Sequence, residues 1–298
     1  MQPKRLCTAE DLDIHDIEWL WAAVDGQSER TGPPVGNLLG VPISLIFAAP
    51  STRTAAAFCA AAHELGAMPI VLTHSSSRLE SGESLEDTIH AISGMIGGLL
   101  VVRGPIDTAC LKLAIPLANA GDNREHPTQA LVDLFAMTSI LHASSPSEMI
   151  DFSMVVLMPN GALVRPVVSL LRLCRILARG SFCVVCESEE QRVEFMQMGG
   201  FPAGTKLEVA SGRHAVELAQ GAEFAYLLES YDGGGNIQLS EWLISLLPKL
   251  SESVILHPLP RSARVASILA NMPKVAIETQ LALHVPVKKG VLRWLVHH

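Results

Sequence analysis

Short apolar runs alternate along the chain with segments in which apolar residues recur at helical spacing. The runs have the length and composition of buried strands. They cover residues 41–47, 69–73, 98–103, 152–158, 182–186, 224–228 and 254–256. Amphipathic or Ala- and Leu-rich segments, such as 55–65, fall between them. Strands that alternate with helices predict an α/β fold with mostly parallel sheets, flanked by helices on both faces.

The length of the chain and one polar segment predict two domains. With 298 residues, the chain is long enough for two domains that each bury a core. A helical pattern over 128–143 is followed by Ser-Ser-Pro-Ser at 144–147, which is typical of a connection. We therefore predict one α/β domain over residues 1–135 and a second over 150–275.

Composition and charge limit the classes of partner. Only 17% of the residues are charged, against about 25% in an average soluble protein, while 49% are hydrophobic. This shortage of charge favours an additional buried surface between subunits. The net charge of −8 argues against nucleic acid and against acidic membranes as partners. No apolar run reaches the roughly 18 residues of a membrane span, and the first residues lack an apolar signal segment, so a cytoplasmic protein is expected.

The most informative motif is Ser51-Thr52-Arg53-Thr54, between the predicted strand 41–47 and the predicted helix 55–65. Ser51 or Thr52 is expected to cap that helix. A helix N-terminus accepts anions, and hydroxyls together with a guanidinium add charge-assisted bonds to phosphate oxygens. An ordinary capped helix with one surface arginine explains the same four residues, so the motif alone leaves both readings open.

Two further motifs decide between these readings. Asn-Ala-Gly-Asp at 119–122 leads into His-Pro-Thr-Gln at 126–129, and His-Pro-Leu-Pro-Arg occupies 257–261. Together with residues 51–54, in this order and spacing, they closely resemble the aspartate and ornithine carbamoyltransferases, and the aspartate branch more than the ornithine branch. The resemblance extends to Gly-Glu-Ser-Leu-Glu-Asp-Thr-Ile at 82–89 and Val-Val-Arg at 101–103.

The resemblance implies a fold and a reaction. Residues 1–135, joined by the C-terminal helix at about 288–298, correspond to the carbamoyl phosphate-binding domain. Residues 150–275 correspond to the domain that binds the amino-acid acceptor, and the active site is expected in the interdomain cleft. The reaction moves the carbamoyl group of carbamoyl phosphate to an amine and releases phosphate. It passes through a tetrahedral oxyanion, which fixed donors stabilise.

The resemblance also implies roles for individual residues. The phosphate is expected to bind Ser51, Thr52, Arg53, Thr54 and Arg103. Arg53, Thr54 and His126 are expected at the carbonyl oxygen. Gln129 is expected to receive the carbamoyl NH2, with the backbone carbonyls of Pro258 and Leu259. An amide nitrogen needs acceptors and an oxyanion needs donors, so this division is chemically consistent. Asp133, one turn beyond Gln129, is expected to be a structural partner.

Two of these residues have a simpler interpretation. An arginine that ends an apolar run, as Arg103 does, is often only solvated, and a lone histidine such as His126 is usually structural. The family motif around each residue favours the functional interpretation.

One departure from the family lies in a loop that reaches a neighbouring subunit. Aspartate carbamoyltransferases carry a Lys-Lys pair at the positions of Glu80 and Ser81, and the second lysine enters the adjacent active site. Arg78 lies three residues before Ser81 and is a candidate replacement, although arginine and lysine differ in geometry. Ser77 matches a serine that the family uses from this loop. A homotrimer, or a multiple of it, is therefore expected.

A second departure concerns the acceptor. The family's carboxylate-binding arginine and glutamine correspond to Glu229 and Tyr231, so an anionic substrate side chain would meet a like charge there. Arg165 falls near the arginine that binds the α-carboxylate. The expected acceptor thus keeps an α-carboxylate or similar anion but has a side chain unlike that of aspartate.

Three functions remain open at this stage. The first is an active carbamoyltransferase that uses an amine other than aspartate. The second is a catalytically impaired paralogue that serves as a non-catalytic subunit. The third is an ordinary aspartate enzyme whose substrate loop is built differently from this alignment. The complete set of phosphate and carbonyl residues favours the first, whereas the missing lysine and arginine favour the second. A metal or an organic cofactor is not expected, because the leaving phosphate can itself accept the amine proton.

Overall fold

The computed structural model describes residues 3–24, 38–232 and 236–297, and these divide into two units. Unit 1 contains residues 1–135 and 282–298, and unit 2 contains residues 136–281. Each unit has its own five-stranded parallel sheet, as the alternating pattern predicts. In the part of the chain that the structure describes, no helix is both long and apolar enough to cross a membrane.

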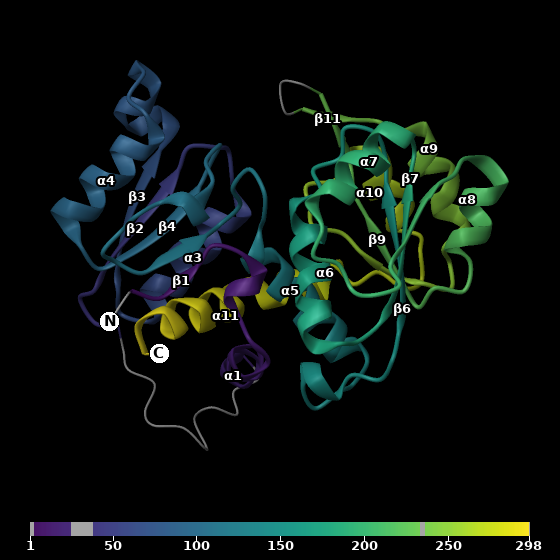
Figure 1. Cartoon of the computed structure of the whole chain (residues 1–298), viewed down its shortest axis with the longest axis horizontal. Helices are drawn as coiled ribbons and strands as arrows, with labels where there is room; N and C mark the ends of the chain where they lie inside the picture. Colours follow the sequence, from purple (N-terminus) through teal and green to yellow (C-terminus); the bar gives the residue numbers. More distant parts are fainter. Residues whose placement is uncertain (1–2, 25–37, 233–235, 298) are drawn as a thin grey trace. The chain divides into compact units, whose positions relative to one another are not determined.

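The sheet of unit 1 has the order β1-β5-β4-β2-β3. Figure 1 labels β1, β2, β3 and β4 in the purple to blue part of the chain. Its strands are β1 (Arg5–Leu6), β2 (Pro42–Phe47), β3 (Met68–Thr73), β4 (Leu99–Arg103) and β5 (Leu117–Asn119). Its helices are α1 (Ile14–Val24), α3 (Arg53–Glu64), α4 (Leu85–Ile96), the first part of α5 (Pro127–Ile140) and most of α11 (Ile277–His297). The strand order reverses between β2 and β4, because β3 adds beyond β2 while β4 adds on the other side. Ligands of open parallel sheets bind at the carboxyl edge beside such a reversal.

Unit 2 repeats this plan with the order β12-β9-β6-β7-β8. Its strands are β6 (Ser153–Met158), β7 (Ser181–Cys186), β8 (Lys206–Val209), β9 (Phe224–Leu227) and β12 (Val254–Leu256), with a separate hairpin of β10 (Ser230–Tyr231) and β11 (Ile237–Gln238). Its helices include α6 (Arg165–Leu177), α7 (Glu189–Met198), α8 (Gly212–Ala219), α9 (Glu241–Leu246) and α10 (Ala263–Leu269). Here the order reverses between β6 and β9.

Each sheet is buried by its own helices. In unit 1, a core cluster joins β2, β4 and β5 through Ile46, Val102 and Leu117. In unit 2, Leu157, Leu227 and Ile255 lie in a cluster that also includes residues of α8 to α10. Strands buried on both faces read as continuous apolar runs, which is why the sequence reveals them.

All seven predicted strands are present with small changes at their ends. The helix predicted over 128–143 ends at Ile140, because His142 takes a left-handed conformation with φ of +52°. The last helix differs most. It begins at Ile277 rather than near residue 288, and it continues through Pro286.

Candidate functional site

The motif at residues 51–54 forms the connection from β2 into α3, at the carboxyl edge of the unit 1 sheet. Thr54 is buried, Ser51 and Arg53 are half-buried, and Thr52 is exposed. The capping prediction is wrong for Thr52: it occupies the N-cap position in a helical conformation, and its hydroxyl makes no capping hydrogen bond. The backbone amides at the N-terminus of α3 and the hydroxyls of Ser51, Thr52 and Thr54 are hydrogen-bond donors in one short segment. Such a set of donors can bind an anion.

Arg103 ends β4, the strand next to β2, and pairs in register with Phe47. Its Nη1 donates to the carbonyl oxygen of Ala120 at 2.9 Å. Gly121 follows with φ of +113°, and a Cβ added there would overlap the Arg103 guanidinium and lie 3.0 Å from Cδ2 of His126. Only glycine permits this approach. Arg103 and His126, which are 23 positions apart in the sequence, therefore lie against the same backbone segment.

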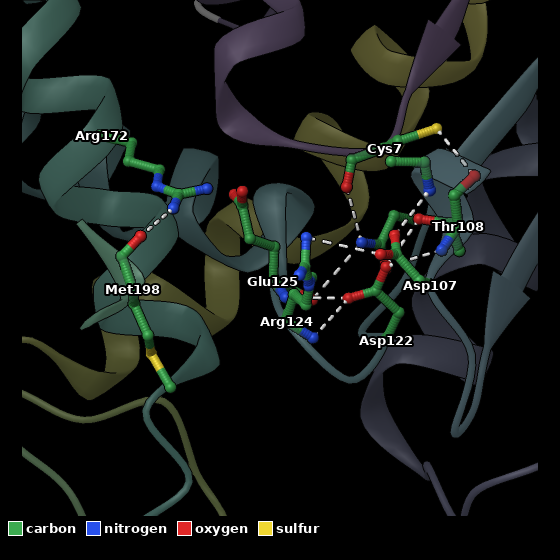
Figure 2. Close-up of polar contacts among 10 residues, drawn as sticks. Cys7, Asp107, Thr108, Asp122, Arg124, Glu125, Arg172 and Met198 are labelled. Atoms are coloured by element: carbon green, nitrogen blue, oxygen red, sulfur yellow. Dashed lines mark hydrogen bonds and ion pairs between the residues drawn. The ribbon is translucent and has the colours of Figure 1, made fainter. Parts of the chain in front are cut away.

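The loop that carries Gly121 is fixed by a buried carboxylate. Asp122 accepts hydrogen bonds on Oδ2 from the backbone amide and hydroxyl of Thr108 and on Oδ1 from the amides of Arg124 and Glu125 (Figure 2). Asn119 adds a bond from Nδ2 to the Cys7 carbonyl at 2.7 Å. The Asn-Ala-Gly-Asp motif thus fixes the conformation of the loop that contacts Arg103 and His126.

His126 and Gln129 lie at the start of α5, and both are buried. Nδ1 of His126 lies 3.4 Å from the hydroxyl of Thr128. Nε2 of Gln129 donates to Oδ1 of Asp133 at 2.8 Å. Because that bond commits the NH2 end of the Gln129 amide, the carbonyl end Oε1 is the group that can accept from a ligand.

Behind this helix lie two titratable residues that the sequence analysis did not identify. Lys288 of α11 is completely buried, and its Nζ donates to the carbonyl oxygen of Thr128 at 3.0 Å. Burial lowers the pKa of Lys288 to about 7, against an opposing attraction from Asp133. Burial, followed by repulsion from Lys288 and Arg53, lowers the pKa of His284 to about 3. The available signal was a histidine and a lysine four positions apart in one helix, a spacing that puts both side chains on the same helix face.

The loop with the predicted intersubunit residues Ser77, Arg78 and Ser81 follows β3. Two short 3-10 turns, His74–Ser76 and Arg78–Ser81, make up the loop. Ser77 is half-buried and donates its hydroxyl proton to the Thr73 carbonyl at 2.8 Å. Arg78 and Ser81 are exposed, so both side chains are accessible on the surface of unit 1.

In unit 2, the predicted acceptor residues follow β6 and β9, the strands at which the order reverses. Arg165 is half-buried and is the first residue of α6. Tyr231 is half-buried, and its amide donates to the Gly161 carbonyl at 3.0 Å, which ties the two connections together.

Glu229 is buried rather than facing an open pocket, with 3% of its surface exposed. Its Oε1 accepts from the amide of Ser262 at 2.7 Å and lies 3.7 Å from Nε2 of His257. Glu229 therefore holds the segment that contains Pro258 and Leu259, both of which are half-buried.

A pocket in unit 2 lies apart from the predicted acceptor residues. Over residues 3–24, 38–232 and 236–297, no group of three or more His, Cys, Asp or Glu side chains is placed to bind a metal ion. A pocket of about 480 Å³ in unit 2 lies between the loop at Asn160 and the helix α7 and is lined by Gln191 and Met198 among others. It includes none of the predicted acceptor residues.

Comparison with known proteins agrees with the motifs. Residues 4–139 match the family model described as aspartate/ornithine carbamoyltransferase, carbamoyl-P binding domain. The aspartate carbamoyltransferase catalytic subunit of Saccharolobus islandicus is 29% identical over 312 residues, covering 98% of this chain and 96% of that protein. The corresponding subunit of Sulfolobus acidocaldarius is 28% identical over 301 residues, covering 97% and 98%.

Solved structures support the fold. Aspartate transcarbamoylase of Trypanosoma cruzi, in complex with N-(phosphonacetyl)-L-aspartic acid, superposes with a TM-score of 0.73 at 22% identity, covering 99% of this chain and 96% of that one. The catalytic subunit of M. jannaschii aspartate transcarbamoylase gives a TM-score of 0.70 at 22% identity, covering 98% of each chain. Residues 4–139 are thus similar to the carbamoyl-P binding domain of the aspartate/ornithine carbamoyltransferases, and almost the whole chain is similar to aspartate carbamoyltransferase catalytic subunits.

Proposed function

We propose that the protein transfers the carbamoyl group of carbamoyl phosphate to the amine of an amino-acid-like acceptor and releases phosphate. The observation that carries this proposal is the arrangement at one edge of the unit 1 sheet. There the N-terminus of α3, the Arg103 guanidinium and the start of α5 follow neighbouring strands. The relatives named aspartate carbamoyltransferase catalytic subunit support the same chemistry.

In this proposal the phosphate binds the α3 N-terminus. Ser51, Thr52 and Thr54 supply hydroxyl and amide donors, and Arg53 and Arg103 supply the positive charge. Backbone amides at a helix N-terminus and paired guanidinium groups are the donors that phosphate recognition uses.

The carbamoyl group binds His126 and Gln129 at the start of α5. Nδ1 of His126 lies 3.4 Å from the Thr128 hydroxyl, and in the tautomer in which Nδ1 accepts that bond, the Nε2–H group donates a hydrogen bond to the carbonyl oxygen, beside Arg53 and Thr54. Gln129 accepts from the carbamoyl NH2 through Oε1. These donors stabilise the oxyanion as it forms, and the departing phosphate takes the amine proton.

We propose an acceptor that has an α-carboxylate but no second carboxylate on its side chain. Arg165 supplies a positive charge at the start of α6. Glu229 stands where the aspartate branch has its second arginine and accepts from the Ser262 amide, so the positive charge for a second substrate carboxylate is missing at that position. The names of the relatives favour aspartate instead, so the acceptor is the point that experiment must decide.

A trimer completes the proposal, with Ser77, Arg78 and Ser81 serving the site of a neighbouring subunit. All six cysteines are free, in agreement with the cytoplasm as the predicted location. The alternative of a non-catalytic subunit is not favoured, because the family matches extend over the residues needed to bind carbamoyl phosphate.

The test is product formation from carbamoyl phosphate and a panel of amines, followed by mass spectrometry. The panel contains aspartate, ornithine, putrescine, 2,3-diaminopropionate and hydroxylated amino acids. A carbamoylated product from an amine other than aspartate supports the proposal in full. Product from aspartate alone contradicts the acceptor class, and no product despite bound carbamoyl phosphate contradicts the activity.

A further inference from the structure

A completely buried lysine contacts the helix that carries Gln129. Lys288 lies on α11, has no exposed surface, and donates from Nζ to the Thr128 carbonyl at 3.0 Å. Thr128 is the residue directly before Gln129, in the first turn of α5. The bond therefore joins two segments that are 160 positions apart at the point where the proposed carbamoyl contacts begin.

The same lysine attracts the carboxylate that orients Gln129. Asp133 is also completely buried, and its charge acts on Lys288. Oδ1 of Asp133 accepts from Nε2 of Gln129 at 2.8 Å. A neutral Asp133 could donate a proton as well as accept one, which would allow the Gln129 amide to turn. An ionised carboxylate only accepts, so it holds the NH2 end toward itself.

The complete burial of the Lys288 ammonium group is energetically unfavourable by itself. Moving an ion out of water costs several kcal/mol, and apolar residues of similar volume often replace buried ion pairs without loss of stability. Packing of α11 against α5 therefore does not require a lysine. The charge is useful where a neighbouring group must be kept in one ionisation state and one orientation.

We propose that Lys288 is a positioning residue for carbamoyl transfer: it fixes the first turn of α5 and keeps Asp133 ionised, so that Gln129 presents Oε1 to the carbamoyl NH2. This inference rests on the proposed function. It assigns Lys288 an effect on the carbamoyl group alone, because the phosphate contacts belong to α3 and Arg103.

The experiment compares Lys288→Met with wild type at pH 6, below the Lys288 pKa of about 7, so that Lys288 is charged. Titration calorimetry gives the affinities for carbamoyl phosphate and for inorganic phosphate. We expect the methionine variant to bind phosphate within about twofold of wild type and carbamoyl phosphate about tenfold more weakly, the size of one lost hydrogen bond. Turnover should fall with the carbamoyl phosphate affinity.

Lys289→Met is the matched control. This neighbour on α11 lies with Nζ 2.8 Å from Glu64 of α3 and is partly exposed, so both affinities should stay at wild-type values. Lys288→Gln provides a second test should the methionine variant fail to fold. Its amide can donate to Thr128 but carries no charge for Asp133, so the carbamoyl phosphate affinity should fall between those of wild type and the methionine variant.

Two results overturn the inference. One is a folded Lys288 variant with the wild-type ratio of the two affinities. The other is an equal loss of both affinities, which indicates a purely structural role. A wild-type protein that binds phosphate but not carbamoyl phosphate contradicts the proposed function itself and is recognised before any variant is made.

Discussion

Arg53 combines a side-chain charge with the first position of a helix. It begins α3 next to a half-buried Ser51, where the helix dipole and the guanidinium both attract an anion. We expect Arg53→Ala to weaken binding of carbamoyl phosphate and of phosphate by about 100-fold, from the loss of charge-assisted hydrogen bonds. Calorimetry measures the affinities, and circular dichroism checks the fold.

Arg124→Ala is the control for that measurement. Arg124 is exposed in the same unit, and its Nη1 lies 3.5 Å from Asp107. It should bind both ligands as wild type does. An Arg53 variant with unchanged affinities removes this residue from the phosphate site.

Replacing Arg78 tests whether this exposed loop supplies the positive charge that a lysine supplies in the family. We expect Arg78→Ala to lower turnover by about tenfold, because a cation near the transition state is lost, while the affinity for phosphate stays the same. Steady-state kinetics with the identified acceptor gives the turnover. Wild-type turnover in this variant excludes Arg78 from the reaction.

The connections after β2, β4 and β5 work as a set, because the parallel register brings their carboxyl ends to one edge. Gly121 is the position at which this packing is closest. We expect Gly121→Ala to cost about 1–3 kcal/mol in the free energy of unfolding, since a side chain at φ of +113° is strained. It should also displace Arg103 and His126 and abolish carbamoyl phosphate binding.

Gly221→Ala is the control that separates backbone strain at a positive φ from displacement of Arg103 and His126. Gly221 also has a positive φ, of +81°, but an added Cβ there meets nothing within 4 Å. Its unfolding free energy, measured in urea, should fall by a similar amount while ligand binding is retained. Normal carbamoyl phosphate binding in the Gly121 variant refutes the close approach.

The elements that sequence patterns missed are short or polar. β1 and β5 have two and three residues, and β8 is an edge strand that alternates with charged residues at Lys206 and Glu208. Such strands are determined by the neighbour with which they pair rather than by their own apolar run. The last helix was expected only near residues 288–298, whereas α11 begins at Ile277 and contains Pro286, a residue that usually ends a helix.

Stability as a function of pH depends on the two buried bases of α11. The pKa of His284 is about 3 in the folded chain, below its ordinary value of 6.5. Between these values the unfolded chain binds more protons, so the free energy of unfolding falls as the pH decreases, by up to about 1.4 kcal/mol per unit. We expect His284→Phe to reduce this slope between pH 6 and about pH 4 in urea unfolding.

His63→Phe is the control, because His63 of α3 is exposed and stays in water; it should keep the wild-type slope. An unchanged slope in the His284 variant contradicts the explanation.

Lys288 affects stability at higher pH. Its pKa of about 7 lies below the ordinary 10.5, so it makes the folded state more stable as the pH rises between these values.

The chain's local patterns were sufficient for the two-sheet α/β fold, the main strands and the motifs at residues 51–54, 126–129 and 257–261. These are periodic or contiguous signals, and parallel strands carry residues that follow them to one edge. The roles of individual site residues and of the two units stay predictions.

Contacts between segments far apart in the sequence are visible only in the tertiary structure. The approach of Gly121 to Arg103, the bond from Lys288 to Thr128 and the bond from Glu229 to Ser262 join residues 18, 160 and 33 positions apart. No local periodicity encodes such a contact, because burial of a charge or a close backbone approach depends on what the rest of the chain places beside it.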